Sequence, residues 1–378
     1  MIKSLFRYVD GKEMVMLRKA LPKILVVMTL CLTAFGQSKP AGEVDIAKCW
    51  AYPLSDNTAS TLAADTANVY IGSSGAKVEA LSLDGKKMWA TEFGGDINSN
   101  LLPTDAGLFL VTATVSDDAA KSGSVLRVVS KETGITSWTA KLPAAERHFL
   151  EIYQGAIIVV SGNGVVQSLD IKDGTVKWKR EIAEGFAGEP RFGGDAVVVG
   201  STAKQAFTIM LTTGEILSLR KIDAGVTSVG RVSTSDVTVG DGLGNVSLFL
   251  GGSEKPSWKF RSGGAISKIL AANGNLFVTS HDNFAYSLYT SNGSLAWKRR
   301  LSGRVSHITV IDDKYMIVSA VDDHAVVLIE LVKGKVAGQI ALGADETLTA
   351  DPVMANGLIL TVTDTAAYAH SLIPCPKQ

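Results

Sequence analysis

Hydrophobic and polar residues alternate along this chain in a pattern that predicts many short β-strands. Residues 154–178 (QGAIIVVSGNGVVQSLDIKDGTVKW) show one copy of it. A β-branched run is followed by a short polar turn, an alternating strand, a Gly-containing turn and a strand that carries Trp178. β-Branched residues favour strands, and strands separated by short polar turns are typical of antiparallel hairpins. The segment therefore predicts a small antiparallel sheet.

The same pattern recurs along almost the whole chain. Its eight copies are residues 67–89, 106–138, 154–178, 194–218, 235–258, 273–297, 312–338 and 356–375. The closing Trp returns at intervals of about 40 residues, which is the size of a four-stranded propeller blade. Ser218 and Gly338 occupy the Trp position in two copies. We therefore predict an all-β fold, an eight-bladed β-propeller of four-stranded blades.

The last copy stops before its Trp, and the missing residue lies at the other end of the chain. Trp50 precedes Trp89 by one repeat length. We expect the N-terminal strand around Trp50 to complete the last blade, whose other three strands come from about residues 347–373. This arrangement closes the ring and hides the sheet edges that an open array would expose.

The tryptophans and two cysteines have structural roles in this prediction. A large aromatic side chain on an outer strand can pack against the next blade. We assign this role to Trp50, Trp89, Trp138, Trp178, Trp258 and Trp297. The alignment puts Cys49 and Cys375 on neighbouring strands of the last blade, so we expect a disulfide that pins the ring closure. Free buried thiols are the alternative.

The N-terminus is typical of a secretory signal peptide over residues 1–36. Basic residues, among them Arg18 and Lys19, precede an apolar run at 24–34, and small residues suit cleavage after Gly36. The apolar run is shorter than the roughly 20 residues that span a bilayer. An uncleaved anchor is the alternative. We expect export to the periplasm.

The remaining chain divides into a short linker, 37–44, and the propeller, 45–375. We expect translation to begin at Met14 or Met16.

The net charge of the mature chain is slightly negative. Residues 1–36 hold six of the 37 Lys and Arg and two of the 37 Asp and Glu, which leaves 31 basic and 35 acidic residues and a net charge of −4. A nucleic-acid binder normally carries a basic excess, so we expect no nucleic-acid partner.

Two copies of the repeat carry a family resemblance. The strings EALSLDGKKMW (79–89) and QSLDIKDGTVKW (167–178) resemble the pyrroloquinoline-quinone (PQQ)-type propeller repeat. Eight such blades behind a signal, with the ending at 350–372, are similar to the BamB family of outer-membrane protein assembly factors. The family's lipidation motif has no match here, because Cys31 follows Leu30 and not a small residue. A lipid anchor is therefore not expected.

This resemblance implies a non-catalytic scaffold in the periplasm at the outer membrane, monomeric on its own. Its expected partner is the barrel subunit of an outer-membrane assembly machine, possibly with unfolded outer-membrane proteins. The same repeat also occurs in quinoprotein dehydrogenases, which resemble a longer propeller with an adjacent Cys–Cys disulfide. This chain has no adjacent cysteines and no nucleophile elbow, zinc-protease or phosphate-loop motif. We expect no catalysis and no cofactor, and rank a dehydrogenase third.

Variable loops on one face of the ring are the candidate functional surface. They join the second strand of each blade to the third, and the fourth to the first strand of the next blade. These loops or their edges collect Arg147, His148, His281, Asp282, Arg304, His307, Asp322, Asp323 and His324, and blade 2 adds residues 116–124. We expect a partner-binding face, because propellers commonly bind through loops. The alternative is a ligand-binding or sensory propeller with a metal or small-molecule site at His148, His281, His307 and His324. Variable polar loops also collect His and Asp without any such site.

Overall fold

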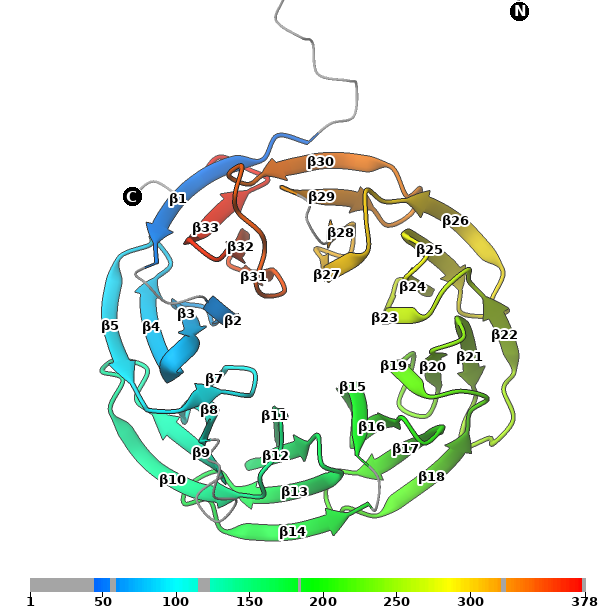
Figure 1. Cartoon of the computed structure of the whole chain (residues 1–378), viewed down its shortest axis with the longest axis horizontal. Coiled ribbons are helices and arrows are strands. Elements are labelled where there is room, and N and C mark those ends of the chain that lie inside the picture. Colours follow the sequence, from blue (N-terminus) through cyan, green and yellow to red (C-terminus); the bar gives the residue numbers. More distant parts are fainter. Residues whose placement is uncertain (1–43, 55–58, 115–122, 183–184, 321–323, 376–378) are drawn as a thin grey trace, which may run out of the picture. The chain divides into compact units, whose positions relative to one another are not determined.

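The β-branched runs of the repeat form the second strand of each sheet in the computed structural model, which describes residues 44–54, 59–114, 123–182, 185–320 and 324–375. Within these residues the chain forms strands β1–β33, one 3₁₀ turn, η1 (Ser74–Ala76), and no α-helix. The strands build eight antiparallel sheets arranged in a ring (Figure 1). The predicted eight-bladed β-propeller is therefore confirmed.

The first four blades are built in chain order, each from the inside of the ring outwards. Blade 1 contains β2 (Ala59–Ala64), β3 (Asn68–Ser73), β4 (Lys77–Ser82) and β5 (Lys87–Glu92). Blade 2 contains β6 (Asp96–Ile97) and β7 (Leu102–Thr104), which both pair with β8 (Gly107–Thr114), then β9 (Gly123–Val129) and β10 (Thr136–Leu142). Blade 3 contains β11 (His148–Tyr153), β12 (Ala156–Ser161), β13 (Val165–Asp170) and β14 (Val176–Glu181). Blade 4 contains β15 (Phe186–Gly193), β16 (Ala196–Ser201), β17 (Gln205–Met210) and β18 (Ile216–Lys221).

The remaining blades follow the same order, except that the last one takes its outer strand from the N-terminus. Blade 5 contains β19 (Val226–Arg231), β20 (Val237–Asp241), β21 (Asn245–Phe249) and β22 (Trp258–Arg261). Blade 6 contains β23 (Ile266–Ala272), β24 (Asn275–Ser280), β25 (Phe284–Tyr289) and β26 (Leu295–Arg300). Blade 7 contains β27 (Val305–Ile311), β28 (Tyr315–Ala320), β29 (Ala325–Glu330) and β30 (Val336–Ala341). Blade 8 contains β31 (Val353–Ala355), β32 (Leu358–Val362), β33 (Ala366–Ser371) and β1 (Ala47–Pro53).

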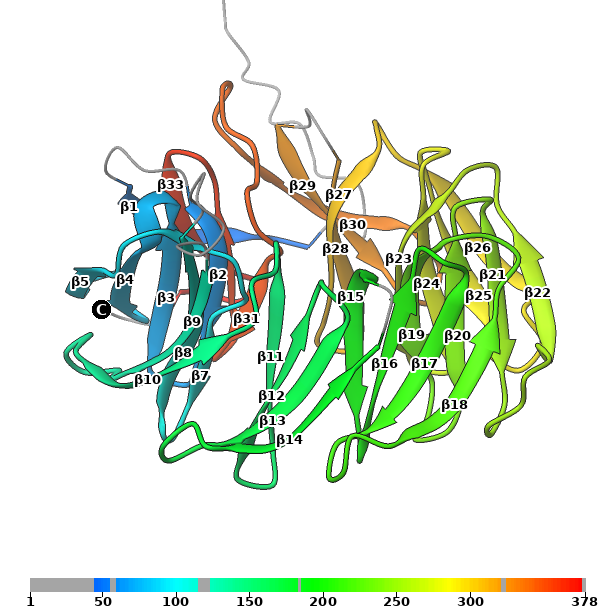
Figure 2. The same ribbon diagram turned by 60° about the horizontal axis from the view of Figure 1, so that its bottom comes forward.

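Burial across a blade explains the hydrophobic pattern of the repeat. In blade 3 every residue of β12 is buried, β13 is buried except for its last residue, and five of the six residues of β14 are exposed. The middle strands are covered on both faces by the neighbouring blades, so they are apolar without alternation. The outer strand is largely exposed to water and therefore carries mostly charged residues, with Trp178 as its half-buried exception. Figure 2 shows the blades side by side, with loops at both ends of the strands.

The ring closes as the sequence predicts. Strand β1 pairs with β33 in antiparallel register, with Ala47 opposite Ser371, and so supplies the outer strand of blade 8. Cys49 and Cys375 form a disulfide, with Cα atoms 5.4 Å apart and 326 residues between them in sequence. A covalent bond thus joins the two ends of the propeller where they meet in one blade.

Each tryptophan of the repeat lies over a glycine in the turn of the following blade. A Cβ atom added at that glycine would approach the indole to 2.4–2.8 Å. The pairs are Trp50–Gly85, Trp89–Gly134, Trp138–Gly174, Trp178–Gly214, Trp258–Gly293 and Trp297–Gly334. Indole N–H groups also donate to backbone carbonyls of the following blade, as Trp178 Nε1 does to the Leu211 carbonyl at 3.1 Å. The glycine therefore permits the turn and also leaves room for the neighbouring Trp.

Two of the eight junctions between blades lack this pair in the described residues. Between blades 4 and 5 the Trp position is Ser218, and the blade 5 turn has Glu254 four residues before Trp258, where Gly stands in most copies. Between blades 7 and 8 the Trp position is Gly338. There the segment that leads into β1 fills the space: Val44 N donates to the Ala337 carbonyl at 2.6 Å, and Ile46 contacts Gly338.

Several predicted features lie outside the described residues. They are the signal peptide 1–36, nearly all of the linker 37–44, most of the blade 2 loop 116–124, and Asp322 and Asp323. The structure contributes nothing to these predictions.

Candidate docking face and central channel

The residues predicted for the variable loop face are distributed over several blades. Arg147, His281, Arg304 and His324 are all exposed, but they belong to loops of blades 2, 6 and 7 or the connections that follow them. Asp282 instead ties its loop to the connection before β23 and to β25: its carboxylate accepts hydrogen bonds from Gly263 N at 2.8 Å and from the Tyr286 hydroxyl at 2.5 Å. The four histidines of the alternative ligand-site hypothesis are not brought together.

His148 is not available on that face, which corrects the prediction. It is the first residue of β11 and is completely buried, with Nδ1 2.9 Å from the Ser161 hydroxyl. Burial lowers the pKa of His148 to about 4, so the ring is neutral near pH 7. The residue follows a loop in sequence, but it begins an inner strand, where its side chain packs inside blade 3. Its role in this structure is therefore structural.

His307 also lies away from the loops, in the wall of the central channel. It is the third residue of β27, and Nδ1 is 3.2 Å from the Asp351 carboxylate. Its Nε2 is 3.2 Å from the Leu348 carbonyl. His307 thus connects blade 7 to the segment that enters blade 8.

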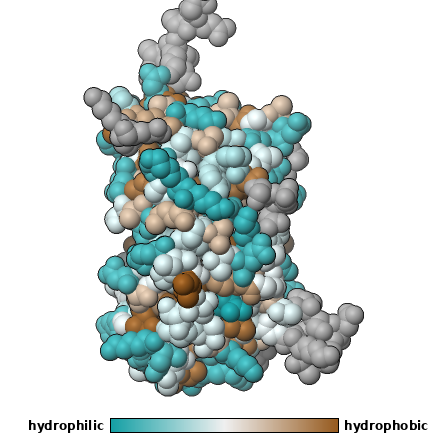
Figure 3. Space-filling model, turned by 90° about the vertical axis from the view of Figure 1, so that its left-hand side faces the viewer, coloured by the Kyte–Doolittle hydropathy of each residue, from teal (hydrophilic) through white to brown (hydrophobic). Residues whose placement is uncertain are grey.

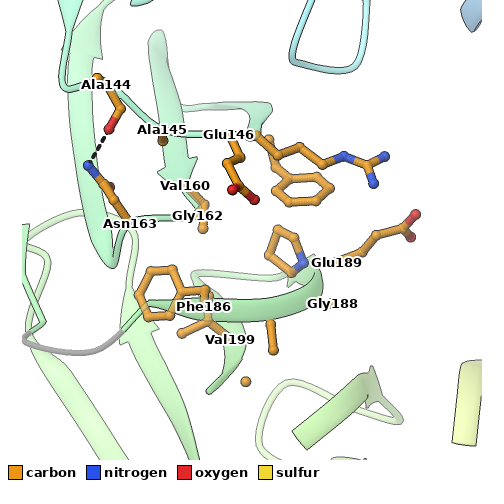
Figure 4. Close-up of a pocket in the computed structure, with 15 residues that line it drawn as sticks. Ala144, Ala145, Glu146, Val160, Gly162, Asn163, Phe186, Gly188, Glu189 and Val199 are labelled. Atoms are coloured by element: carbon orange, nitrogen blue, oxygen red, sulfur yellow. Dashed lines mark hydrogen bonds between the residues drawn. The ribbon is translucent and has the colours of Figure 1, made fainter. Parts of the chain in front are cut away.

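A pocket of about 500 Å³ opens on the loop face between blades 3 and 4 (Figure 4). Apolar side chains, including Phe149 and Phe186, form part of its lining, and Glu146 and Glu189 add carboxylates. The guanidinium of exposed Arg147 lies over the Phe149 ring, 4.9 Å from its centroid, a cation–π contact. An aromatic surface beside a cation is suited to binding a protein side chain, since both apolar and charged contacts are offered at once.

The loops around this pocket are held in place by hydrogen bonds. Asn163 Nδ2 donates to the Ala144 carbonyl at 2.9 Å (Figure 4), and Gly162 N donates to the Arg147 carbonyl at 2.8 Å. Phe186 N donates to the Gly162 carbonyl at 2.9 Å. These bonds join the loop before β11, the loop after β12 and the start of β15. The pocket is therefore formed before any partner arrives.

Strand β15 bulges into the channel beside the pocket. Ala187 pairs with Gly200 and Arg191 pairs with Val198, so two more residues lie on β15 than on β16. Gly188, at φ +70°, allows this turn of the backbone, and an added Cβ would lie 2.5 Å from the Thr227 carbonyl oxygen. Bulges often redirect side chains at functional sites. Here the bulge directs Glu189 toward the ring axis.

The channel encloses about 1070 Å³ and contains an ion-pair network drawn from four blades. Lys268 of β23 lies 2.5 Å from the Asp351 carboxylate and 3.4 Å from the Glu189 carboxylate. Arg191 pairs with Glu189 at 3.0 Å. With His307 these residues join blades 4, 6, 7 and 8, so the network holds the channel walls in register.

The pKa shifts follow from these contacts. Burial alone would raise the pKa of Asp351, but the hydrogen bond from His307 and the charge of Lys268 hold it at about 2. For Glu189, burial is likewise outweighed by Lys268 and Arg191, which lower its pKa. Burial raises the pKa of Glu151, on the channel side of β11. The carboxylates of Asp351 and Glu189 are therefore charged at neutral pH and stabilised by the neighbouring cations.

In the parts of the chain that the structure describes, no three His, Cys, Asp or Glu side chains lie close enough to hold a metal ion. None of the helices found there is long and apolar enough to cross a membrane.

The predicted site residues do not include the four charged residues of the channel network, Glu189, Arg191, Lys268 and Asp351. Each is a charged residue in or beside an inner strand, where most neighbouring positions are apolar or small, and that contrast is a signal in the sequence. Their mutual contacts, between residues up to 83 positions apart, have no such signal.

Three kinds of comparison relate this chain to known proteins. The sequence model of the family described as "Outer membrane protein assembly factor BamB" matches residues 43–241 and 230–371. BamB of Yersinia pestis is 21% identical over 315 residues, which cover 78% of this chain and 79% of that protein. BamB of Moranella endobia is 23% identical over 282 residues, covering 66% and 71%.

Solved structures share the fold. The crystal structure of BamB from Moraxella catarrhalis matches with a TM-score of 0.66 at 16% identity, covering 88% of this chain and all of that one. The computationally designed Ika8 protein matches with a TM-score of 0.71 at 12% identity, covering 85% and 99%. At these identities the structural matches support the propeller fold alone.

Proposed function

Because the chain belongs to the family of the outer membrane protein assembly factor BamB, we propose that it is a non-catalytic scaffold that assists the assembly of β-barrel proteins into the outer membrane. The family match over most of the chain carries this proposal. The protein acts in the periplasm by binding other proteins, and it is monomeric on its own. Its partner is the barrel subunit of the assembly machine.

We propose that the partner docks at the loop-face pocket between blades 3 and 4. Phe149 and Phe186 would bury an apolar side chain, and Arg147 would pair with an acidic residue of the partner. The preformed loops reduce the entropy that docking would otherwise cost. Neither the apolar contact nor the ion pair requires a cofactor or a reacting group.

Affinity purification from the native envelope tests this proposal. The tagged wild-type chain should recover the barrel subunit, and Arg147→Glu should recover much less. Lys333→Glu makes the same charge change at an exposed position in a turn on the opposite face, and should behave like the wild type. Failure of the wild type to recover any assembly-machine barrel subunit, while other partners are retained, would overturn the proposed function. Equal recovery with Arg147→Glu would overturn only the location of the site.

A further inference from the structure

The outer strand of blade 4 differs from the other outer strands in the residues it exposes. Leu217 and Leu219 of β18 are 46% and 38% exposed, whereas the 42% exposure of Ile216 is shared by apolar residues at its position in other blades, such as Val176 and Leu295. The sheet ends at β18, so the backbone groups on its outward edge pair with no further strand among the described residues. An exposed apolar edge strand normally invites pairing with another chain, and proteins usually block it with charged residues.

The repeat itself provides the comparison. The positions of Leu217 and Leu219 are filled in β14 by Lys177 and Lys179, both exposed. The equivalent faces of the other outer strands carry mostly charged, small or polar residues, such as Lys259 and Arg261 in β22 and Lys298 and Arg300 in β26. The large apolar exception is Met88 of β5, 44% exposed, which has the small residue Ala90 beside it on that face. Figure 3, which shows the rim around β5, has hydrophobic residues scattered among hydrophilic ones. Blade 4 therefore lacks the protection that its sister blades have.

The inner side of β18 is already filled. Arg220, only 1% exposed, takes part of the space next to Ser218, and its Nη1 donates to the Thr208 hydroxyl at 2.9 Å and the Ser218 hydroxyl at 2.7 Å. Its guanidinium lies 5.5 Å from the centroid of the Phe249 ring in blade 5. A ligand therefore has access to the outer edge and the solvent face of β18, and not to the junction with blade 5.

The other junction without a Trp shows how such an edge is covered in this protein. At blade 7 the extended segment Val44–Ile46 lies along β30, with Val44 N bonded to the Ala337 carbonyl at 2.6 Å. Val44 and Ile46 pack against the same hydrophobic cluster as Ala337, which is only 6% exposed. Ala337 and Leu217 occupy equivalent positions, one residue before the Trp position. Ala337 is covered by the segment Val44–Ile46, whereas Leu217 is exposed to solvent.

We propose that β18 binds an extended segment of another polypeptide, with apolar residues at alternate positions, which adds to the edge of blade 4. Its backbone would pair with β18, as strands do when they extend a sheet, and its apolar side chains would cover Leu217 and Leu219. The site lies on the outer rim and is independent of the loop-face pocket and of the family assignment.

A labelled peptide of about ten residues, with Val and Thr at alternate positions, tests the proposal. Fluorescence anisotropy should show that it binds the full chain, and that Leu217→Lys/Leu219→Lys, which copies β14, weakens binding at least about tenfold. Ile135→Lys removes a more exposed apolar residue from blade 2 and should leave binding unchanged. A peptide with Pro at alternate positions should not bind, because it lacks the N–H donors for pairing.

Three results would overturn the proposal. They are no binding of the Val–Thr peptide, equal binding by the double lysine variant, or equal binding of the Pro peptide, which would indicate nonspecific hydrophobic contact. Sedimentation identifies a different occupant: a wild-type dimer that the double lysine variant abolishes would show that β18 pairs with a second copy of this chain.

Discussion

Single residues in this propeller serve two blades at once. Gly214 allows the turn that starts the outer strand of blade 4, at φ +70°, and also receives the indole of Trp178 from blade 3. The spacing of Gly and Trp in the sequence predicts the turn and the packing toward the next blade. It does not reveal that the Gly of one repeat contacts the Trp of the preceding blade, while the Trp of the same repeat contacts the Gly of the following blade. These contacts appear only when the ring is assembled.

Substituting Gly214 separates these two roles. Gly214→Ala should destabilise the fold by the left-handed backbone cost of about 1–2 kcal/mol plus about 1–3 kcal/mol of overpacking against Trp178. Gly155→Ala is the matched control, since Gly155 has φ +72° and nothing within 4 Å of the added Cβ. It should show the backbone cost alone. Urea unfolding measures both, and equal losses would mean that the Trp contact contributes nothing.

His148 predicts how stability depends on pH. Its folded pKa is about 4, below the ordinary histidine value of 6.5, so the unfolded state binds a proton first as pH falls. Its contribution is present above pH 6.5 and is lost as pH falls through about 4, with a slope of about 1.4 kcal/mol per pH unit. His148→Leu should reduce the slope of unfolding free energy against pH in this window. An unchanged slope would show that folding does not lower the pKa of His148.

At the scale of elements, the sequence predicts strands better than the contacts between them. The run AIIVVS identifies β12 because a strand covered on both faces needs no polar residue, and Trp178 after the Gly turn identifies β14 as an outer strand. The bulge in β15 has a weaker signal, Gly188 and Pro190 inside an otherwise regular strand. The channel network has none, since it joins side chains from four blades.

The ion-pair network of the channel should contribute measurably to stability through Lys268. Lys268→Met removes the cation between Glu189 and Asp351 and should destabilise the fold by about 1–3 kcal/mol, less than for a fully buried pair because both carboxylates are about a third exposed. Lys177→Met breaks a more exposed ion pair with Asp170 and should cost at most about 1 kcal/mol. Urea unfolding at pH 7 compares them.

The same variant has an expected acid response. Asp351 has a folded pKa of about 2, so its stabilising contribution is present above the unfolded value of 3.8 and lost as pH falls through 2. Without Lys268 the pKa of Asp351 rises toward its ordinary value, and less stability remains to be lost on acidification. If the wild type and Lys268→Met lose equal stability between pH 4 and pH 2, Lys268 is not what holds Asp351 ionised.

At the scale of the whole molecule, the closure of the ring was predictable because the repeat count is incomplete without Trp50. Strand β1 completes blade 8, and the segment before it covers Gly338 in blade 7. The first described residues thus contribute to two blades. The loop-face residues were predicted less well, since a loop in sequence adjoins both exposed positions such as Arg147 and buried strand starts such as His148.

The Cys49–Cys375 disulfide should therefore stabilise the ring as a whole. It links residues 326 positions apart, and restricting so long a loop in the unfolded chain contributes about 6 kcal/mol in the chain-entropy description. Cys49→Ser/Cys375→Ser should keep the β-sheet circular dichroism and lose a large part of the unfolding free energy. Amide hydrogen exchange should accelerate first in β1 and β33, because the bond joins their blade, while β12, on a distant blade, should remain the more protected. Equal acceleration in β1 and β12 would show that blade 8 does not open before the rest and that the disulfide acts only on the unfolded chain.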